Sequence, residues 1–171
     1  IKMANFYITT TLPYVNADPH IGFAMEIIQA DVIARFKRLS GYEVFFNTGT
    51  DEHGQKVWQE AVKRGIAPQD YVNEYAGKFE ILKEKLNLYP DLHFIRTTDQ
   101  HHKKAAKEFW ERCKKNIGPD GPDIYKKNYQ GLYCVGCESF KDGNELINGE
   151  CPQHRQKPEL VEEENYIFKL S

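Results

Sequence analysis

Residues 6–26 read F-Y-I-T-T-T-L-P-Y-V-N-A-D-P-H-I-G-F-A-M-E, and this stretch decides the fold of the chain. Its first part, Phe6 to Thr11, is rich in the aromatic and β-branched residues that are typical of a strand. Between Leu12 and Pro19, prolines, an asparagine and an aspartate interrupt the pattern and predict a loop. Apolar residues then recur at steps of three and four, which predicts a helix. These residues are Ile21, Met25, Ile28, Val32 and Phe36.

A strand that leads through a loop into the start of a helix is the place where α/β sheets bind nucleotides. The first N–H groups of a helix have no partner within it, and together with the helix dipole they attract a phosphate. His20 stands just before the helix start as a hydrogen-bond donor, and Gly22 lacks the Cβ that would block a planar base. The alternative is an ordinary core strand and core helix, in which His20 caps the helix or is merely exposed.

The composition is that of an ordinary globular protein. With 171 residues, the chain can bury the core of one domain, or of one domain that carries a small insert. Its net charge of −2 gives no general attraction for nucleic acid, so any contact with RNA must be local. No apolar run approaches the length of a membrane span, and no basic-then-apolar signal segment precedes the first strand. We therefore expect a cytoplasmic protein with no membrane partner.

A second site is predicted at the end of the next strand. Residues 44–46 (V-F-F) form a short strand, and residues 48–54 (T-G-T-D-E-H-G) follow it as a polar loop. The carboxyl ends of strands form the usual ligand edge of an open parallel sheet. Asp51 in this loop is a suitable partner for a cationic amino group, because a charge strengthens the hydrogen bond. Equally, Asp51, Glu52 and His53 could begin a helix as an N-cap followed by acidic residues.

Further helices and a third strand are predicted before residue 118. The helices cover residues 55–63, a segment that begins at Pro68, and a segment from Asp99 to about Lys115; the strand covers residues 92–97. One apolar stripe is expected to pack in the core: Tyr71, Tyr75, Phe79, Leu82 and Leu86. On the last helix, Phe109 and Cys113 are expected to face inward, whereas the many lysines form a solvated face.

The clearest boundary in the chain is G-P-D-G-P at residues 118–122. We predict one domain over residues 1–117 and an insert with a return strand over residues 118–171.

The insert contains two pairs of metal-binding residue types. Cys134 and Cys137 form a C-x-x-C pair, and Cys151 and His154 form a C-x-x-H pair. In a reducing compartment such pairs favour a metal over disulfides. Three thiolates and an imidazole suit tetrahedral Zn²⁺, and four protein ligands leave no open position, so we predict a structural zinc site. The alternative is that surface cysteines lie at these spacings by chance.

Several motifs resemble those of one enzyme family. The segment P-H-I-G-F (residues 19–23) resembles the H-I-G-H signature of class I aminoacyl-tRNA synthetases, and T-L-P-Y-V-N-A-D before it is similar to the version in methionyl-tRNA synthetases. T-G-T-D-E-H-G is similar to a second motif of that family and argues against the related enzymes for branched aliphatic amino acids. Y-Q-G-L-Y-C-V-G-C-E-S-F, C-P-Q-H and E-E-N-Y-I-F-K-L-S resemble its connective insert with one zinc. The resemblance spans nearly all of the chain.

This resemblance implies a fold and an activity. The fold is of the α/β class: a Rossmann-like doubly wound parallel sheet, of which this chain holds the first half, with a small zinc-knuckle insert. The activity is the ATP-dependent conversion of methionine to methionyl adenylate, followed by transfer of the methionyl group to tRNA. Mg²⁺ would accompany the ATP, and one structural Zn²⁺ would occupy the insert.

The resemblance also implies roles for single residues. Leu12, Tyr14 and Asp51 are expected to bind methionine, with Asp51 on its amino group. The catalytic residues are expected to be His20 and Gly22. The ATP site is expected to comprise His20, Gly22, Phe23 and Glu26.

Phe23 stands where the family signature has its second histidine. A phenyl ring cannot donate a hydrogen bond to the ATP phosphates. Either another donor compensates, such as Asn16 or a lysine from elsewhere in the enzyme, or the protein activates methionine poorly. A ring that merely packs on its helix is compatible with both cases. We expect compensation, because the other motifs match.

The chain contains no K-M-S-K-S sequence and no helical anticodon-binding domain. We therefore expect its partner to be a C-terminal half of the enzyme, and the chain alone to be inactive. Two alternatives stay open. One is a non-catalytic zinc-bearing fragment, or one half of a split enzyme, that binds a partner or tRNA. The other is a different nucleotidyltransferase with a similar phosphate loop, which would have no need of the zinc insert.

Overall fold

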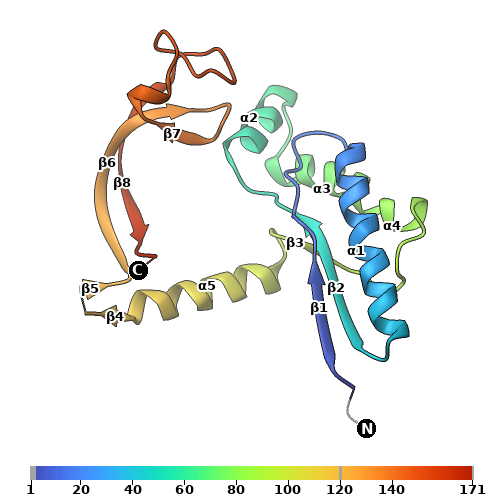
Figure 1. The fold of residues 1–171 in the computed structure, drawn as a ribbon. Coiled ribbons are helices and arrows are strands. Elements are labelled where there is room, and N and C mark those ends of the chain that lie inside the picture. The colour runs from blue at the N-terminus through green and yellow to red at the C-terminus, as the bar shows by residue number, and fades with distance from the viewer. Residues whose placement is uncertain (1–2, 120, 171) are drawn as a thin grey trace. The chain divides into compact units, whose positions relative to one another are not determined.

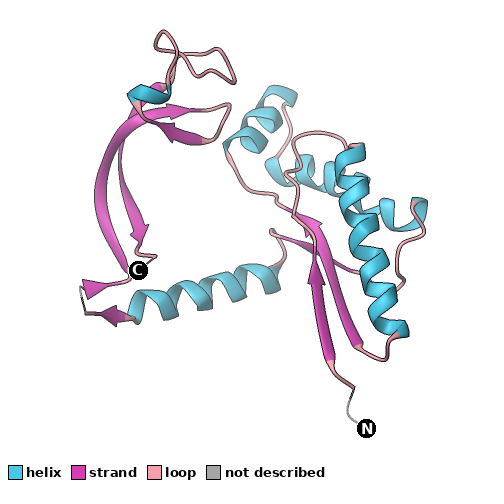
Figure 2. Ribbon diagram, viewed as in Figure 1, coloured by secondary structure: helices cyan, strands magenta, loops and turns pink. Residues whose placement is uncertain are grey.

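A computed structural model describes residues 3–119 and 121–170 of the chain, which divides into two compact units. The first unit is Ile1–Lys104 and the second is Ala105–Ser171. The first unit combines parallel strands with helices, whereas the second is dominated by antiparallel strands (Figures 1 and 2). Within the described ranges, no helix is both long and apolar enough to cross a membrane.

The first unit is built on a parallel sheet. Its strands β1 (Asn5–Thr9), β2 (Glu43–Thr50) and β3 (His93–Arg96) lie in the order β1-β2-β3. Because the strands are parallel, their carboxyl ends meet at one edge. Helical connections between parallel neighbours are typical of a Rossmann-like fold, and the sheet confirms the predicted fold class.

Four helices join and cover these strands: α1 (Ile21–Leu39), α2 (Gln55–Arg64), α3 (Pro68–Glu80) and α4 (Leu82–Lys85). Their ends follow the predicted signals, since α2 stops at Gly65, which has a φ of 66°, and α3 begins with Pro68. The stripe predicted after Pro68 is confirmed, because Tyr71 and Phe79 are buried and the others pack against the core. The core also includes Phe23, Ile27, Ala34, Phe46, Val57, Ala61, Val72, Leu88 and Leu92.

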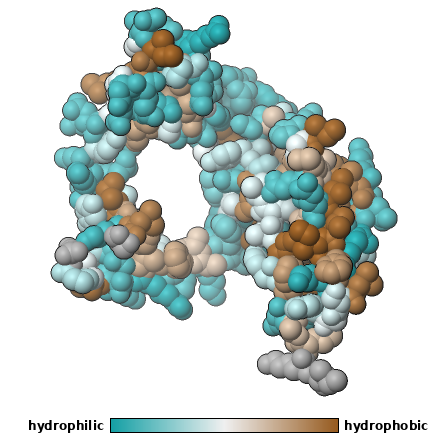
Figure 3. Space-filling view, viewed as in Figure 1, coloured by the Kyte–Doolittle hydropathy of each residue, from teal (hydrophilic) through white to brown (hydrophobic). Residues whose placement is uncertain are grey.

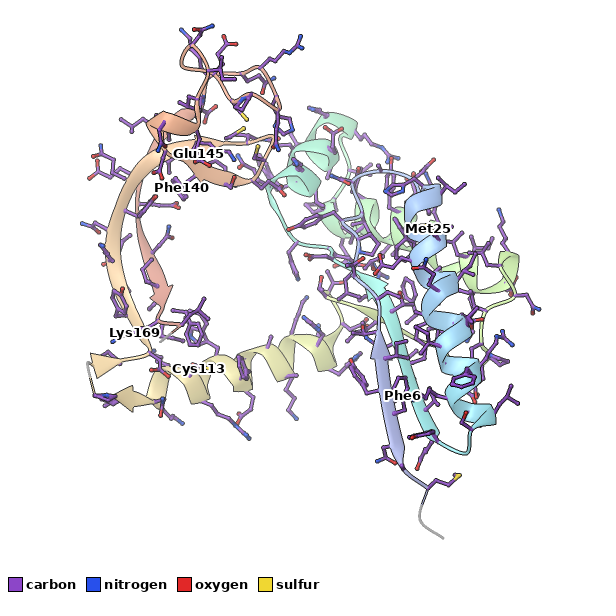
Figure 4. The ribbon with its side chains drawn as sticks, in the orientation of Figure 1. Phe6, Met25, Cys113, Phe140, Glu145 and Lys169 are labelled. Carbon is purple, nitrogen blue, oxygen red and sulfur yellow. The ribbon has the colours of Figure 1, made fainter. Side chains whose placement is uncertain are left out.

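Helix α1 carries two apolar stripes, and the stripe that predicted the helix is not the one that packs. Phe23, Ile27 and Ala34 face the core. The first stripe is exposed: Ile21 88%, Met25 58%, Ile28 41%, Val32 60% and Phe36 63%. Figure 3 shows the apolar patch over this helix, and Figure 4 labels Met25 on it. An exposed apolar stripe of this length is typical of a surface that further polypeptide covers.

The sheet face away from the core carries aromatic rings. Tyr7 stacks on Phe45 with ring centroids 5.6 Å apart, and Phe45 stacks on His93 at 4.3 Å. The three rings come from β1, β2 and β3 in turn, and Tyr7 and Phe45 are exposed. Parallel sheets are normally covered on both faces, so this face also lacks its usual cover within the described residues.

Helix α5 (Gln100–Lys115) begins at the end of the first unit, and most of its residues belong to the second. The second unit also contains a sheet in the order β7-β6-β8. A short hairpin of β4 (Ile117–Gly118) and β5 (Gly121–Pro122) follows the helix. Strand β6 (Ile124–Cys134) pairs along its length with β8 (Glu159–Phe168) and at its end with β7 (Ser139–Lys141). A 3₁₀ turn (Gly143–Glu145) follows β7. The long β6–β8 ribbon was not predicted beyond its return strand.

The predicted inward face of α5 is wrong at Phe109. This side chain is 69% exposed, and none of the helix residues is buried. Cys113, labelled in Figure 4, is half-buried. The aromatic contact of the helix in this unit comes instead from Trp110, which meets Tyr166 edge-on at 5.4 Å. The spacing of Phe109 and Cys113 suggested a core-facing stripe, but every residue of α5 is exposed or only half-buried.

Candidate active site and metal centre

The loop after β1 continues alongside the end of β2. The Asp51 N–H donates to the Pro13 carbonyl at 2.9 Å, and the Val15 N–H donates to the Asp51 carbonyl at 3.3 Å. Tyr14 and Asp51 thereby form an isolated parallel bridge. Leu12 is half-buried and Tyr14 is 48% exposed. The structure therefore brings the three predicted methionine-site residues to one edge of the sheet.

The Asp51 carboxylate is half-buried and weakly held. Its Oδ1 accepts from the His53 N–H and from the Thr97 hydroxyl, each at 3.5 Å. No cationic side chain among residues 3–119 and 121–170 forms an ion pair with it. Helix α2 starts later, with Gly54 as its N-cap and no acidic residue in its first turn, so the alternative role of Asp51 as a helix cap is wrong.

The neighbouring acid, Glu52, has a different environment. Its side chain has no solvent exposure, and it pairs with Arg96 through two hydrogen bonds of 2.6 and 2.9 Å. The hydroxyls of Thr50 and Thr98 also donate to this carboxylate. The hydrogen bond to Glu52 raises the pKa of the Arg96 guanidinium. This buried pair joins the ends of β2 and β3, and sequence reasoning did not find it.

His20 is the N-cap of α1. Its Nδ1 accepts from the N–H groups of Gly22 at 3.1 Å and Phe23 at 3.4 Å. A ring that accepts at Nδ1 carries its hydrogen on Nε2, so the exposed imidazole keeps one donor for a ligand. A Cβ on Gly22 would lie 3.0 Å from the His20 ring, which shows that the glycine also makes room for the cap.

Phe23 and Glu26 hold the start of α1 in place. The Phe23 ring is 5% exposed and meets Phe79 of α3 edge-on at 5.4 Å. The Glu26 carboxylate accepts from the Thr11 N–H at 2.7 Å and from the Thr11 hydroxyl at 2.8 Å. Both side chains therefore have structural contacts, and their direct contact with ATP stays a prediction.

A pocket of about 220 Å³ lies beside the helix start. It is lined by Pro13, Tyr14, Asn16, Ala17, Asp18, His20, Phe23 and Phe79. The structure thus brings Tyr14, His20 and Phe23 to one cavity, whereas Leu12, Glu26 and Asp51 do not line it. Phe79 was predicted as a core residue, and its place in the pocket wall could not be read from the stripe.

The four predicted metal ligands meet at one point. Cys137 Sγ lies 3.5 Å from Cys151 Sγ and 3.3 Å from His154 Nδ1, and the four ligand atoms all lie within 4.8 Å of one another. Cys134 Sγ lies 4.0 Å from the same nitrogen. Ligand atoms around a tetrahedral Zn²⁺ are separated by roughly 3.5–3.8 Å, so the cluster needs little adjustment to bind an ion.

Two further features prepare this cluster for a cation. Hydrogen bonding to His154 lowers the pKa of the Cys151 thiol to about 6, whereas desolvation and hydrogen bonding to Cys151 raise the pKa of the adjacent Cys137 thiol to about 11, so only the Cys151 thiolate is favoured before an ion binds. A Cβ on Gly136 would lie only 2.4 Å from Cγ of His154. A glycine between Cys134 and Cys137 is therefore what lets the imidazole approach the sulfur atoms.

Comparisons with known proteins show the family of the chain. Residues 6–168 match the family model described as tRNA synthetases class I (M). The methionine–tRNA ligases of Thermotoga maritima and Thermosynechococcus vestitus are 51% and 48% identical, over 97% and 98% of this chain. The methionyl-tRNA synthetase of Mycobacterium tuberculosis, solved with methionyl-adenylate, superposes with a TM-score of 0.85 at 41% identity over 99% of this chain. The chain spans only 26–31% of those two relatives and 33% of that structure.

We expect Glu52→Gln to lower the free energy of unfolding by about 3 kcal/mol, because it leaves the Arg96 charge without its carboxylate. The matched control is Glu108→Gln, which breaks the exposed Glu108–Arg112 pair and should cost no more than about 0.5 kcal/mol. Urea denaturation of both variants measures the difference. Equal effects would show that the buried pair contributes no more than a surface pair.

Proposed function

Since the chain belongs to the class I (M) family of tRNA synthetases, we propose that it forms part of a methionine–tRNA ligase and carries the methionine and ATP sites of that enzyme. The observation that carries the proposal is the bridge between Tyr14 and Asp51. It places a half-buried carboxylate, which has no cationic partner among the described residues, beside the loop that leads to the capped helix. The likeness to a synthetase solved with methionyl-adenylate supports it.

In the proposed reaction, the methionine carboxylate attacks the α-phosphorus of ATP and pyrophosphate leaves. A terminal hydroxyl of tRNA then attacks the methionyl carbonyl and releases AMP. Catalysis of the first step consists of positioning and of stabilising phosphate charge. Asp51 binds the α-amino group, while Leu12 and Tyr14 shape the rest of the methionine site. His20 donates to a phosphate through Nε2, and Gly22 admits the adenine. Mg²⁺ enters with the ATP and neutralises phosphate charge.

Asp51→Ala in the complete enzyme should raise the KM for methionine by about 10- to 150-fold, the range for loss of a hydrogen bond to a charged group. The KM for ATP should change little. The matched control is Glu43→Ala, because Glu43 is an exposed carboxylate at the opposite end of the same strand. Pyrophosphate exchange measures both constants. If both rise together in Asp51→Ala, the residue does not recognise the amino group.

The packing of Phe23 supports compensation for the missing histidine. Its ring is held in the core by Phe79, and Asn16 lines the same pocket as His20. The Asn16 amide has the donor that a phenyl ring lacks. We infer that Asn16 contributes the hydrogen bond to phosphate and that Phe23 anchors the helix start.

Phe23→His should therefore not increase the rate of pyrophosphate exchange, because it places a polar ring in an apolar site. Asn16→Ala should lower kcat at least tenfold, towards the cost of about 10²–10³ for one pre-organised donor. Met25→His is the control, since Met25 is exposed on the same helix. A tenfold gain in Phe23→His would show instead that the natural protein is impaired.

We also propose that the metal site binds one Zn²⁺ through Cys134, Cys137, Cys151 and His154. Four protein ligands leave no position for a substrate, so the ion is structural. The contribution of the metal to the folding free energy matters here, because the 3₁₀ turn Gly143–Glu145 and the turns around the cluster bury few apolar groups. In this proposal Gly136 provides the space for the His154 ring.

Freshly purified protein should contain one zinc per chain by elemental analysis. Gly136→Ala should weaken zinc binding roughly 10-fold or more in competition with a chromogenic chelator, the effect typical of groups that orient a ligand. Cys113→Ser should keep the metal, because Cys113 lies on α5 outside the cluster. Metal-free preparations, or Gly136→Ala with normal affinity, would contradict the respective parts of this proposal.

The remainder of the enzyme is the main partner in this proposal. The exposed stripe of α1 and the ring-bearing face of the sheet are apolar surfaces of the kind that further polypeptide covers. We propose that the chain alone does not activate methionine, that the complete enzyme binds tRNA, and that it acts in the cytoplasm. A non-catalytic zinc-bearing fragment would also be inactive alone. The two cases differ when a C-terminal partner is added, because the partner restores pyrophosphate exchange only if the chain is part of the ligase.

A further inference from the structure

Thr97 follows β3 directly and contacts four consecutive residues of the loop that carries Asp51. Its N–H donates to the carbonyl of Thr50 at 3.2 Å, and its own carbonyl meets Nε2 of His53 at 3.2 Å. Its hydroxyl oxygen accepts from the N–H of Glu52 at 2.8 Å. The same hydroxyl lies 3.5 Å from Oδ1 of Asp51. No motif of the sequence pointed to this residue.

The direction of the hydroxyl hydrogen follows from these contacts. Thr97 is 8% exposed, so its hydroxyl has little access to water. The N–H of Glu52 can only donate, so the Thr97 hydroxyl oxygen is the acceptor in their hydrogen bond. Among the described residues, the acceptor within reach of the hydroxyl hydrogen is Oδ1 of Asp51. The Thr97 hydroxyl therefore donates its hydrogen to the Asp51 carboxylate.

This hydrogen bond acts on one oxygen of the carboxylate. Oδ1 of Asp51 has two donors, the Thr97 hydroxyl and the His53 N–H. Within residues 3–119 and 121–170, Oδ2 has no hydrogen-bond or ion-pair partner. One oxygen is thus held by the protein, and the other is left to accept from a ligand.

We propose that Thr97 is a positioning residue for the amino-group site, whose hydroxyl orients the Asp51 carboxylate towards the ammonium of the amino-acid substrate. The inference rests on the proposed function of Asp51 and adds a residue that acts through it. A residue of this kind changes recognition of the amino group without changing recognition of ATP. A merely structural threonine would affect both substrates together.

The test compares Thr97→Val, which keeps the shape but removes the hydroxyl, with Thr97→Ser, which keeps the hydroxyl. In the complete enzyme, Thr97→Val should raise the KM for methionine about 3- to 10-fold, the effect of losing one modest hydrogen bond. The KM for ATP should stay the same. Thr97→Ser should restore a methionine KM close to that of the natural enzyme.

Two inhibitors separate amino-group recognition from the rest of the site. Methioninol has the amine and lacks the carboxylate, whereas 4-(methylthio)butanoate has the carboxylate and lacks the amine. Thr97→Val should weaken inhibition by methioninol and leave inhibition by 4-(methylthio)butanoate unchanged. Thr48→Val is the matched control, because it removes another buried hydroxyl of the sheet that pairs with Thr10 and not with Asp51.

The inference is overturned if Thr97→Val changes both inhibitors equally, if Thr97→Ser is as impaired as Thr97→Val, or if Thr48→Val reproduces the effect. The Asp51→Ala variant distinguishes this failure from failure of the proposed function. If Asp51→Ala discriminates between the inhibitors and Thr97→Val does not, only the role of Thr97 is wrong. If Asp51→Ala does not discriminate, the amino-group site itself is wrong, and the role of Thr97 falls with it.

Discussion

The ion pair between Glu52 and Arg96 is the interaction on which the candidate site depends. A carboxylate with no solvent exposure is costly unless its charge is paired and its oxygens are hydrogen-bonded, and here Arg96 and two threonines meet both conditions. The pair connects the end of β2 to the end of β3, at the edge of the sheet where loops follow the carboxyl ends of the parallel strands. By fixing Glu52, the pair also fixes the backbone of its neighbours in the chain, one of which is Asp51.

At the start of α1, as at Asp51 and Glu52, neighbouring residues have different roles: some face a ligand and others make structural contacts. His20 and Gly22 occupy the helix terminus, where the His20 ring caps two backbone N–H groups and the helix dipole favours an anion. Phe23 turns inward on Phe79, and Glu26 ties the helix back to Thr11. His20 and Gly22 can stay exposed because Phe23 and Glu26 make the contacts that hold the helix start. The departure from the family signature at Phe23 falls on a position that the structure uses for packing.

The second unit is stabilised differently. Both faces of the β6–β8 ribbon are largely exposed, and a two-stranded ribbon has little independent stability. Phe140 of β7 contacts Tyr129 and Tyr133 of β6 edge-on, with ring centroids 4.4 and 5.1 Å away, and so links the two strands of this hairpin. A unit with so few buried side chains depends on local constraints, and the metal proposed for its cysteine–histidine cluster would supply one.

Local patterns in the sequence determined the parallel α/β unit, the ends of its helices and the four members of the metal cluster. Hydrophobic period, glycine and proline positions, and C-x-x-C spacing act over a few residues, so they can be read without a fold. Tertiary structure alone decided which stripe of α1 packs, that Phe109 is exposed, and that Glu52 is the structural acid while one oxygen of Asp51 has no partner in the described part of the chain. The different roles of Glu52 and Asp51 depend on Arg96 and Thr97, which lie more than forty residues further along the chain, and no local pattern records which distant side chains the sheet brings to its edge.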